Sequence, residues 1–352
     1  MRLLILGGTE FVGRHLAQSA DAAGHDVTLF NRGSKPDVLP HLPRISGDRD
    51  GGLAGLAGKE FDAVADVNGY LPRLVRDAAE LLAPRVGRYL FVSTISVYAE
   101  TTAPFATEDA PVGELDDPAT EASDGGSYGP LKAACEKVVA DVFAGDRATI
   151  VRPGLVVGRF DPTDRFTYWV RRVWRGGEFL APGRPGTVLQ WVDVRDLARF
   201  VVRLLENGTA GVFNAVRPPD SVTMGALVAA AEQAAGERAV AGAQGRTSGE
   251  SGRAPDTGRQ SVATPVWVDE DFLATRDVRP WADLPAWLPA ADNLLLRLSS
   301  RRAEAAGLGT SALLDTVADV LDWDLERGMP PLKAGLSAER EAELLAAWSR
   351  AA

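Results

Sequence analysis

Short apolar runs of strand length alternate with helix-length segments through the first half of the chain. Residues 2–6 and 26–30 have the character of strands, and residues 11–23 between them have the spacing of a helix. Strands that alternate with helices form βαβ units, in which parallel strands are covered by helices on both faces. The sequence therefore predicts an α/β fold with a doubly wound parallel sheet. Further strands are expected at residues 44–46, 63–66, 88–93 and 148–152.

The pattern loosens after residue 152, which indicates a second structural region. We expect a core domain over residues 1–158 and a smaller, mainly substrate-binding C-terminal domain over residues 159–352, with residues 189–215 returning to the core. Residues 236–264 are rich in glycine, serine, alanine and arginine and show no apolar period. We therefore expect them to form a flexible surface loop.

Composition narrows the class of protein. The 352 residues carry a formal net charge of −10, which argues against nucleic acid as a partner. No apolar run reaches the roughly 18 residues that a membrane span needs, so no membrane partner is expected. The single cysteine, Cys135, is typical of a reducing compartment, and we expect a cytoplasmic protein. The three histidines lack the spacing of metal ligands, and no metal is expected.

A glycine-rich turn follows the first expected strand, where residues 7–13 read Gly-Gly-Thr-Glu-Phe-Val-Gly. Glycines let the backbone approach a pyrophosphate, and the helix that follows offers free N–H groups and a positive dipole end. This position predicts a dinucleotide site in a Rossmann-type sheet. Glu10 replaces the middle glycine of the usual pattern, and its carboxylate is unfavourable beside a pyrophosphate unless it points away. The candidate cofactor contacts here are Gly7, Thr9, Glu10, Phe11, Val12 and Gly13.

The end of the second expected strand indicates which dinucleotide is bound. An acidic residue there would favour NAD through the ribose 2′-hydroxyl. This chain instead carries Asn31 and Arg32, and the guanidinium of Arg32 can make charge-assisted contacts to a 2′-phosphate. NADP is therefore the predicted cofactor, with NAD as the alternative.

Tyr128 and Lys132 lie four residues apart on an expected helix over residues 128–143, so they share one face of it. An ammonium close to a phenol stabilises the ionised phenol, which can then exchange a proton with a substrate oxygen. Ser93 ends the expected strand at 88–93, and Thr94 follows it. A hydroxyl at the carboxyl end of such a strand faces the cofactor crevice and can orient the substrate.

Together these motifs resemble the extended and atypical short-chain dehydrogenases/reductases, also called the NAD-dependent epimerase/dehydratase family. The resemblance covers about residues 1–215 and includes Gly-Asp-Arg at 47–49 and Arg-Pro-Gly at 152–154. It implies that Thr94 is the catalytic hydroxyl, that Tyr128 is the acid/base, and that Lys132 holds the nicotinamide ribose and tunes the tyrosine. The further cofactor contacts that it implies are Asp48, Arg49, Asn68, Ser93, Pro153 and Leu155.

The sequence leaves three functions open. The first is an NAD(P)-dependent oxidoreductase acting on a carbonyl or alcohol group of a small molecule. The second is a sugar or sugar-nucleotide epimerase that keeps its cofactor tightly bound. The third is a cofactor-binding RNA-associated or regulatory protein, because the atypical branch includes chloroplast proteins that bind RNA. Ile95 and Ser96 stand where 4,6-dehydratases of the family carry their acid and base, which argues against dehydration. The helix at 128–143 is often a dimer surface in such relatives, so a homodimer is expected.

Overall fold

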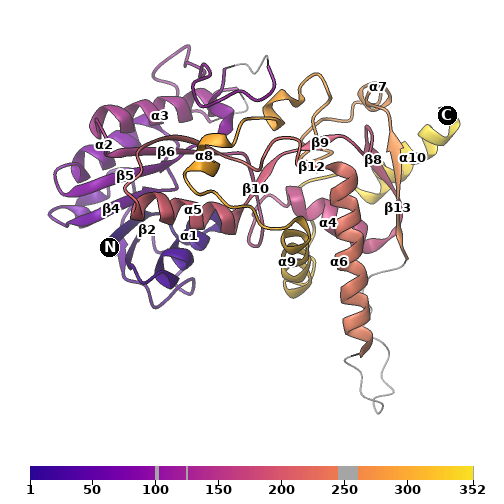
Figure 1. The fold of residues 1–352 in the computed structure, drawn as a ribbon, viewed down its shortest axis with the longest axis horizontal. Coiled ribbons are helices and arrows are strands. Elements are labelled where there is room, and N and C mark those ends of the chain that lie inside the picture. The colour runs from indigo at the N-terminus through magenta and orange to yellow at the C-terminus, as the bar shows by residue number, and fades with distance from the viewer. Residues whose placement is uncertain (100–102, 124–125, 245–260, 352) are drawn as a thin grey trace. The chain divides into compact units, whose positions relative to one another are not determined.

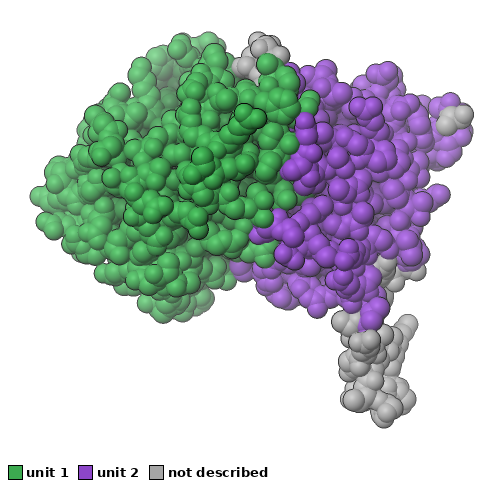
Figure 2. Space-filling view, in the orientation of Figure 1, with its two compact units in different colours: residues 1–156, 191–219, 297–310 green, residues 157–190, 220–296, 311–352 purple. Residues whose placement is uncertain are grey.

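The computed structural model describes residues 1–99, 103–123, 126–244 and 261–351, and the chain divides into two compact units (Figures 1 and 2). Unit 1 contains residues 1–156, 191–219 and 297–310, and unit 2 contains residues 157–190, 220–296 and 311–352. Residues 297–310 thus belong to the first unit, which no pattern in the sequence had indicated.

Unit 1 is built on a parallel sheet of seven strands in the order β11-β6-β5-β4-β1-β2-β3. This order confirms the predicted Rossmann-type doubly wound fold. The strands are β1 (Arg2–Leu6), β2 (Asp26–Asn31), β3 (Arg44–Ser46), β4 (Phe61–Asp66), β5 (Val86–Val92), β6 (Ala148–Pro153) and β11 (Gly211–Ala215).

Alternate residues of these strands pack against two different layers of helices. Leu3 and Ile5 of β1 join a core with α1 (Phe11–Ala22) and α5 (Val194–Glu206). Leu4 and Leu6 of the same strand join a core with α2 (Pro72–Leu82) and α3 (Tyr128–Val142). Because side chains alternate across a strand, one apolar run supplies both cores. The unit also contains η1 (Leu53–Leu56), η2 (Ile95–Val97) and α8 (Arg301–Ala305).

Unit 2 combines helices with short strand pairs. Its helices are α4 (Arg165–Arg175), α6 (Met224–Gln244), α7 (Glu270–Ala274), η3 (Asn293–Leu296), α9 (Leu313–Glu326) and α10 (Ala338–Ala351). Parallel β8 (Gly177–Pro182) and β13 (Ala263–Val268) form one pair, and antiparallel β9 (Val188–Leu189) and β12 (Val222–Thr223) form another. The pair of β7 (Leu155–Val157) and β10 (Trp191–Asp193) belongs instead to unit 1, except for Val157, the first residue of unit 2.

The prediction of a loop over residues 236–264 is wrong at both ends of that range, where the chain forms a helix and a strand. Helix α6 continues to Gln244, and residues from Ala263 onward belong to β13, while residues 245–260 lie outside the described part. Alanine, the strongest helix former, is frequent from residue 229 onward. The amide of Gln233 also donates to the carboxylate of Glu237 one turn later, at 2.9 Å. Local helix propensity therefore prolonged the helix where no apolar period marked it.

Candidate functional site

The glycine-rich turn has the backbone geometry that its sequence predicts. Gly7 and Gly8 have φ angles of +119° and +92°, which side-chain-bearing residues rarely adopt. A Cβ on Gly13 would lie 2.7 Å from the backbone nitrogen of Gly8, so only glycine lets α1 pack this closely on the turn. Helix α1 begins at Phe11, and the N–H groups of its first turn lie at the carboxyl end of β1. The turn therefore offers an open backbone surface for a phosphate group.

The carboxylate of Glu10 does not stand as an isolated charge. Glu10 is the exposed N-cap residue of α1, and its Oε1 lies 2.6 Å from Nζ of Lys35. This ion pair compensates much of the repulsion that Glu10 would exert on a pyrophosphate. Asn31 reinforces the turn from the end of β2, since its side chain donates to the carbonyl of Gly7 and accepts from the N–H of Gly33. Arg32 beside it is exposed.

A buried ion pair supports the segment after β3. Both terminal nitrogens of Arg49 donate to the carboxylate of Asp66, at 2.5 and 2.8 Å, and the hydroxyl of Tyr89 donates to the same carboxylate at 2.7 Å. Burial would raise the pKa of Asp66, but the Arg49 guanidinium and these hydrogen bonds lower it below its ordinary value. Arg49, expected to contact cofactor, thus has its charge balanced inside the protein. Its neighbour Asp48 is exposed.

Lys132 is buried at the carboxyl ends of β4 and β5. Its ammonium donates to the carbonyls of Gly69 and Val92, each at 2.8 Å, and lies 4.1 Å from the centre of the Phe91 ring. Burial lowers the pKa of Lys132 to about 8. Tyr128, half-buried, begins α3 one turn before this lysine. The helix thus brings both predicted residues to the edge of the sheet where open α/β folds bind ligands.

The two predicted hydroxyls follow β5. Thr94 is buried and caps η2, accepting from the N–H of Ser96 at 3.1 Å. Ser93 is buried too, and within the described residues its Oγ has no hydrogen-bond partner. A buried hydroxyl without a partner is costly unless a ligand completes it. Ser93 therefore leaves hydrogen-bonding capacity at this strand end, whereas the Thr94 hydroxyl also donates to Oγ of Ser96, at 3.2 Å.

The remaining predicted contacts lie near the same edge. Asn68, two residues beyond β4, is exposed, and its backbone N–H donates to Asp66 at 3.1 Å. Pro153 ends β6, and Leu155 begins β7. Thr9, Phe11 and Val12 are partly exposed around the glycine turn.

A second buried hydrogen-bond network joins α3 to strands β6 and β11, and no pattern in the sequence predicted it. Arg152 donates to both carboxylate oxygens of Glu136 and to the hydroxyl of Tyr98, and that hydroxyl donates to Oδ1 of Asn214 at 2.6 Å. Glu136 follows Lys132 by one helical turn, so the network fixes α3 on the sheet. The spacing Lys132-x-x-x-Glu136 was the one local signal of it.

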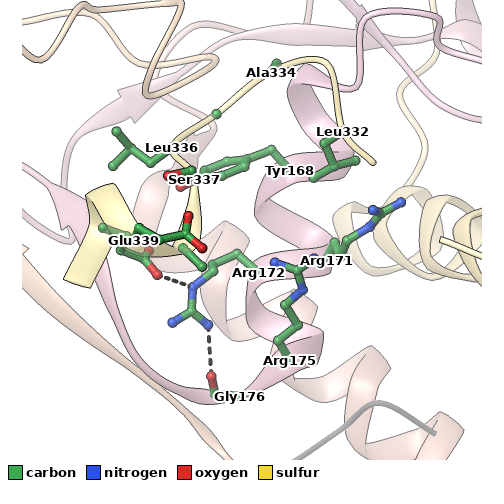
Figure 3. A pocket seen from close by; sticks show the side chains of 13 residues that line it. Tyr168, Arg171, Arg172, Arg175, Gly176, Leu332, Ala334, Leu336, Ser337 and Glu339 are labelled. Carbon is green, nitrogen blue, oxygen red and sulfur yellow. Dashed lines mark hydrogen bonds and ion pairs between the residues drawn. The ribbon is translucent and has the colours of Figure 1, made fainter. Parts of the chain in front are cut away.

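Unit 2 contains a polar cavity of about 660 Å³ between α4 and the start of α10 (Figure 3). Arg171 pairs with Asp324, and Arg172 pairs with Glu341 and donates to the carbonyl of Gly176, so two of its guanidinium groups are neutralised. No site residue predicted from the sequence lines it. Among the described residues, no cluster of three or more potential metal ligands occurs. Nor is any described helix both long and apolar enough to cross a bilayer.

Comparisons with known proteins agree with the fold and the family resemblance. Residues 55–215 match the model of the NAD dependent epimerase/dehydratase family. The chloroplast stem-loop binding protein of 41 kDa b from Arabidopsis thaliana is 27% identical over 255 residues, which cover 67% of this chain and 63% of that protein. This chain thus spans less than two thirds of that relative. The epimerase family protein SDR39U1 from Bos taurus is 26% identical over 240 residues, covering 63% of this chain and 76% of that protein.

Solved structures share the fold. UDP-glucuronic acid 4-epimerase from Bacillus cereus, in complex with NAD, has a TM-score of 0.62 at 14% identity, covering 93% of this chain and 99% of that one. Human epimerase family protein SDR39U1 (isoform 2) with NADPH has a TM-score of 0.56 at 22% identity, covering 92% of this chain and 99% of that one. At such identities the likeness establishes the fold alone.

Proposed function

Since residues 55–215 match the NAD dependent epimerase/dehydratase family, we propose that the chain is an NAD(P)-dependent oxidoreductase of the short-chain dehydrogenase/reductase type. It acts on a carbonyl or alcohol group of a small molecule. The observation that carries this proposal is the buried ammonium of Lys132, one helical turn beyond Tyr128 at the carboxyl edge of the sheet. The catalytic set is Thr94, Tyr128 and Lys132.

The residues present fit a dinucleotide. The positive φ angles of Gly7 and Gly8, with the close approach of Gly13, leave room for a pyrophosphate at the start of α1. The unpartnered Oγ of buried Ser93 offers a hydrogen bond near Lys132. When bound, the nicotinamide supplies the hydride, or accepts it, at the reacting carbon.

The chain's own residues supply binding and proton transfer. Thr94 binds and orients the substrate oxygen, and the Tyr128 hydroxyl gives a proton to that oxygen in reduction or takes it in oxidation. The ammonium of Lys132 favours the ionised tyrosine and holds the nicotinamide ribose. Ile95 and Ser96 offer no acid/base pair for water loss, so the reaction is not a dehydration.

NADP is the preferred cofactor in this proposal. Arg32 is exposed directly after β2, where the 2′ position of the adenosine ribose lies in this fold. The guanidinium of Arg32 suits a negatively charged 2′-phosphate better than the neutral ribose hydroxyl of NAD. NAD remains the alternative cofactor.

Calorimetry with NADPH and NADH tests the proposal first, followed by NADPH oxidation with a panel of aldehydes and ketones. Tyr128→Phe is expected to bind cofactor as the wild type does and to lose turnover. Tyr168→Phe is the matched control, because it removes a phenol hydroxyl in unit 2 that has no part in the proposed chemistry. Binding of neither dinucleotide, or full turnover by Tyr128→Phe, would refute the proposal.

An epimerase that uses the same residues is the second candidate. It is favoured by the family description and by the epimerases among the proteins of similar fold. Such an enzyme oxidises and re-reduces its substrate without net use of cofactor. NAD(P) that stays bound through purification, with no turnover of added NADPH but conversion of UDP-sugars, would select it over the reductase.

An RNA-associated role is the third candidate, and the name of the Arabidopsis relative supports it. The net charge of −10 opposes it, because phosphate backbones are bound mainly by positive charge. A gel-shift titration with stem-loop RNA at low salt separates this role from the enzymatic ones.

A further inference from the structure

Tyr70 is a half-exposed aromatic residue beside the predicted catalytic lysine. Its side chain is 48% exposed, although large apolar rings are normally buried. The ammonium of Lys132 lies 5.4 Å from the centre of the Tyr70 ring, within the range of a cation–π contact. The same ammonium touches Phe91 from within the core. The Tyr70 ring is therefore in contact with the lysine while part of its surface faces solvent.

The backbone that carries Tyr70 is fixed by its neighbours. The N–H of Asn68 donates to Asp66, and the carbonyl of Gly69 accepts from Lys132. A Cβ on Gly69 would lie 2.6 Å from the Phe91 ring, so this residue packs with no space for a side chain. Helix α2 begins two residues after Tyr70. The exposure of the ring thus belongs to a defined position and not to a loose loop.

This position lies between the two ends of the expected dinucleotide site. Strand β4 stands between β1, which carries the glycine turn, and β5, which carries Ser93 and Thr94. A Cβ on Gly7 would lie 2.8 Å from the side chain of Val67, so the segment after β4 runs against the glycine turn. Burial raises the pKa of Tyr70, and the carboxylates of Asp66 and Glu10 raise it further, so the phenol stays protonated at neutral pH.

We propose that Tyr70 is a cofactor-positioning residue, whose ring forms the wall of the crevice between the glycine turn and Lys132 and packs against the nicotinamide-ribose half of the dinucleotide. This inference rests on the proposed function and adds to it a residue that the motifs did not indicate. An aromatic face can pack on a ribose and a pyridine ring while keeping the ammonium of Lys132 shielded from water. The phenol hydroxyl is not needed for this contact.

The experiment compares the whole dinucleotide with its adenosine half. Calorimetry measures the tighter of NADPH and NADH, and the matching fragment, adenosine 2′,5′-bisphosphate or AMP, on the full chain. Tyr70→Ala is expected to raise the Kd of the dinucleotide about tenfold and to leave the Kd of the fragment unchanged, since only the dinucleotide reaches the ring. Tyr70→Phe keeps the ring and should bind within about twofold of wild type.

Phe105→Ala is the matched control, because Phe105 is another exposed aromatic of unit 1, at 45% exposure. It should change neither affinity. Three results would overturn the inference while the proposed function stands. Tyr70→Ala could bind the dinucleotide as tightly as the wild type, or lose affinity equally for the dinucleotide and the fragment. Tyr70→Phe could also bind the dinucleotide as weakly as Tyr70→Ala does. A wild type that binds neither dinucleotide would overturn both.

Discussion

The carboxylate of Asp66 accepts hydrogen bonds from both terminal nitrogens of Arg49 inside unit 1, although the two residues lie 17 positions apart in the chain. The pair joins the segment after β3 to the end of β4, the strand next to β1. It therefore fixes two loops at the carboxyl edge of the sheet, one carrying Asp48 and the other carrying Asn68 and Tyr70.

Arg49→Met is expected to destabilise the protein by about 3–5 kcal/mol, because it leaves a buried carboxylate without a counterion. Urea unfolding at pH 7 measures this loss. Since the folded pKa of Asp66 is lowered, the contribution of the pair is complete above about pH 4 and is lost as the pH falls through the folded value. Arg73→Met, which removes exposed ion pairs with Asp50 and Glu121, should leave the unfolding midpoint nearly unchanged. Equal effects of the two substitutions would contradict this account.

Gly13→Ala is expected to weaken dinucleotide binding at least about tenfold, because the new Cβ would meet the backbone of Gly8 and push α1 away from the turn. Isothermal titration with NADPH measures the change. Gly186→Ala is the control, since a Cβ there meets no atom within 4 Å. If Gly13→Ala bound NADPH as tightly as the control, the turn would not be the pyrophosphate site.

Arg32→Ala is expected to weaken NADPH binding roughly tenfold to a hundredfold, because one charge-assisted contact is lost, and to leave NADH binding unchanged. The ratio of the two Kd values is the measurement. Arg85→Ala removes an exposed arginine just before β5, at the opposite edge of the sheet, and should change neither. A parallel loss of both dinucleotides in Arg32→Ala would argue against recognition of a 2′-phosphate.

The rate of the proposed reduction is expected to fall as the pH rises through about 8, where Lys132 in the free enzyme loses its proton. The pH profile of kcat/KM for NADPH, the substrate that combines with the free enzyme, reports this step. The stability of the fold is expected to change in the opposite direction and to rise with pH. Burial lowers the pKa of Lys132, so keeping its ammonium charged in the folded protein costs stability below about pH 8. That cost disappears as the pH rises from about 8 to the ordinary pKa of lysine. A kcat/KM that stays level up to pH 10 would show that the ammonium is not required.

Much of the fold could be predicted because its signals are local. The apolar period of each strand, the glycines of residues 7–13 and the four-residue spacing of Tyr128 and Lys132 are all read within one turn or one strand. The extension of α6 to Gln244 was missed because alanine and glycine carry no apolar period, although alanine alone favours a helix.

By itself the sequence determined the parallel sheet, the glycine turn and the shared helix face of Tyr128 and Lys132. Tertiary structure decided the partners: Asp66 for Arg49, Glu136 and Tyr98 for Arg152, Lys35 for Glu10, and the Tyr70 ring beside Lys132. Periodicity states which face a residue occupies, whereas the partner of a buried charge depends on which distant strand ends packing brings together. Because Tyr98 and Asn214 meet across 116 positions, no local pattern could have paired them.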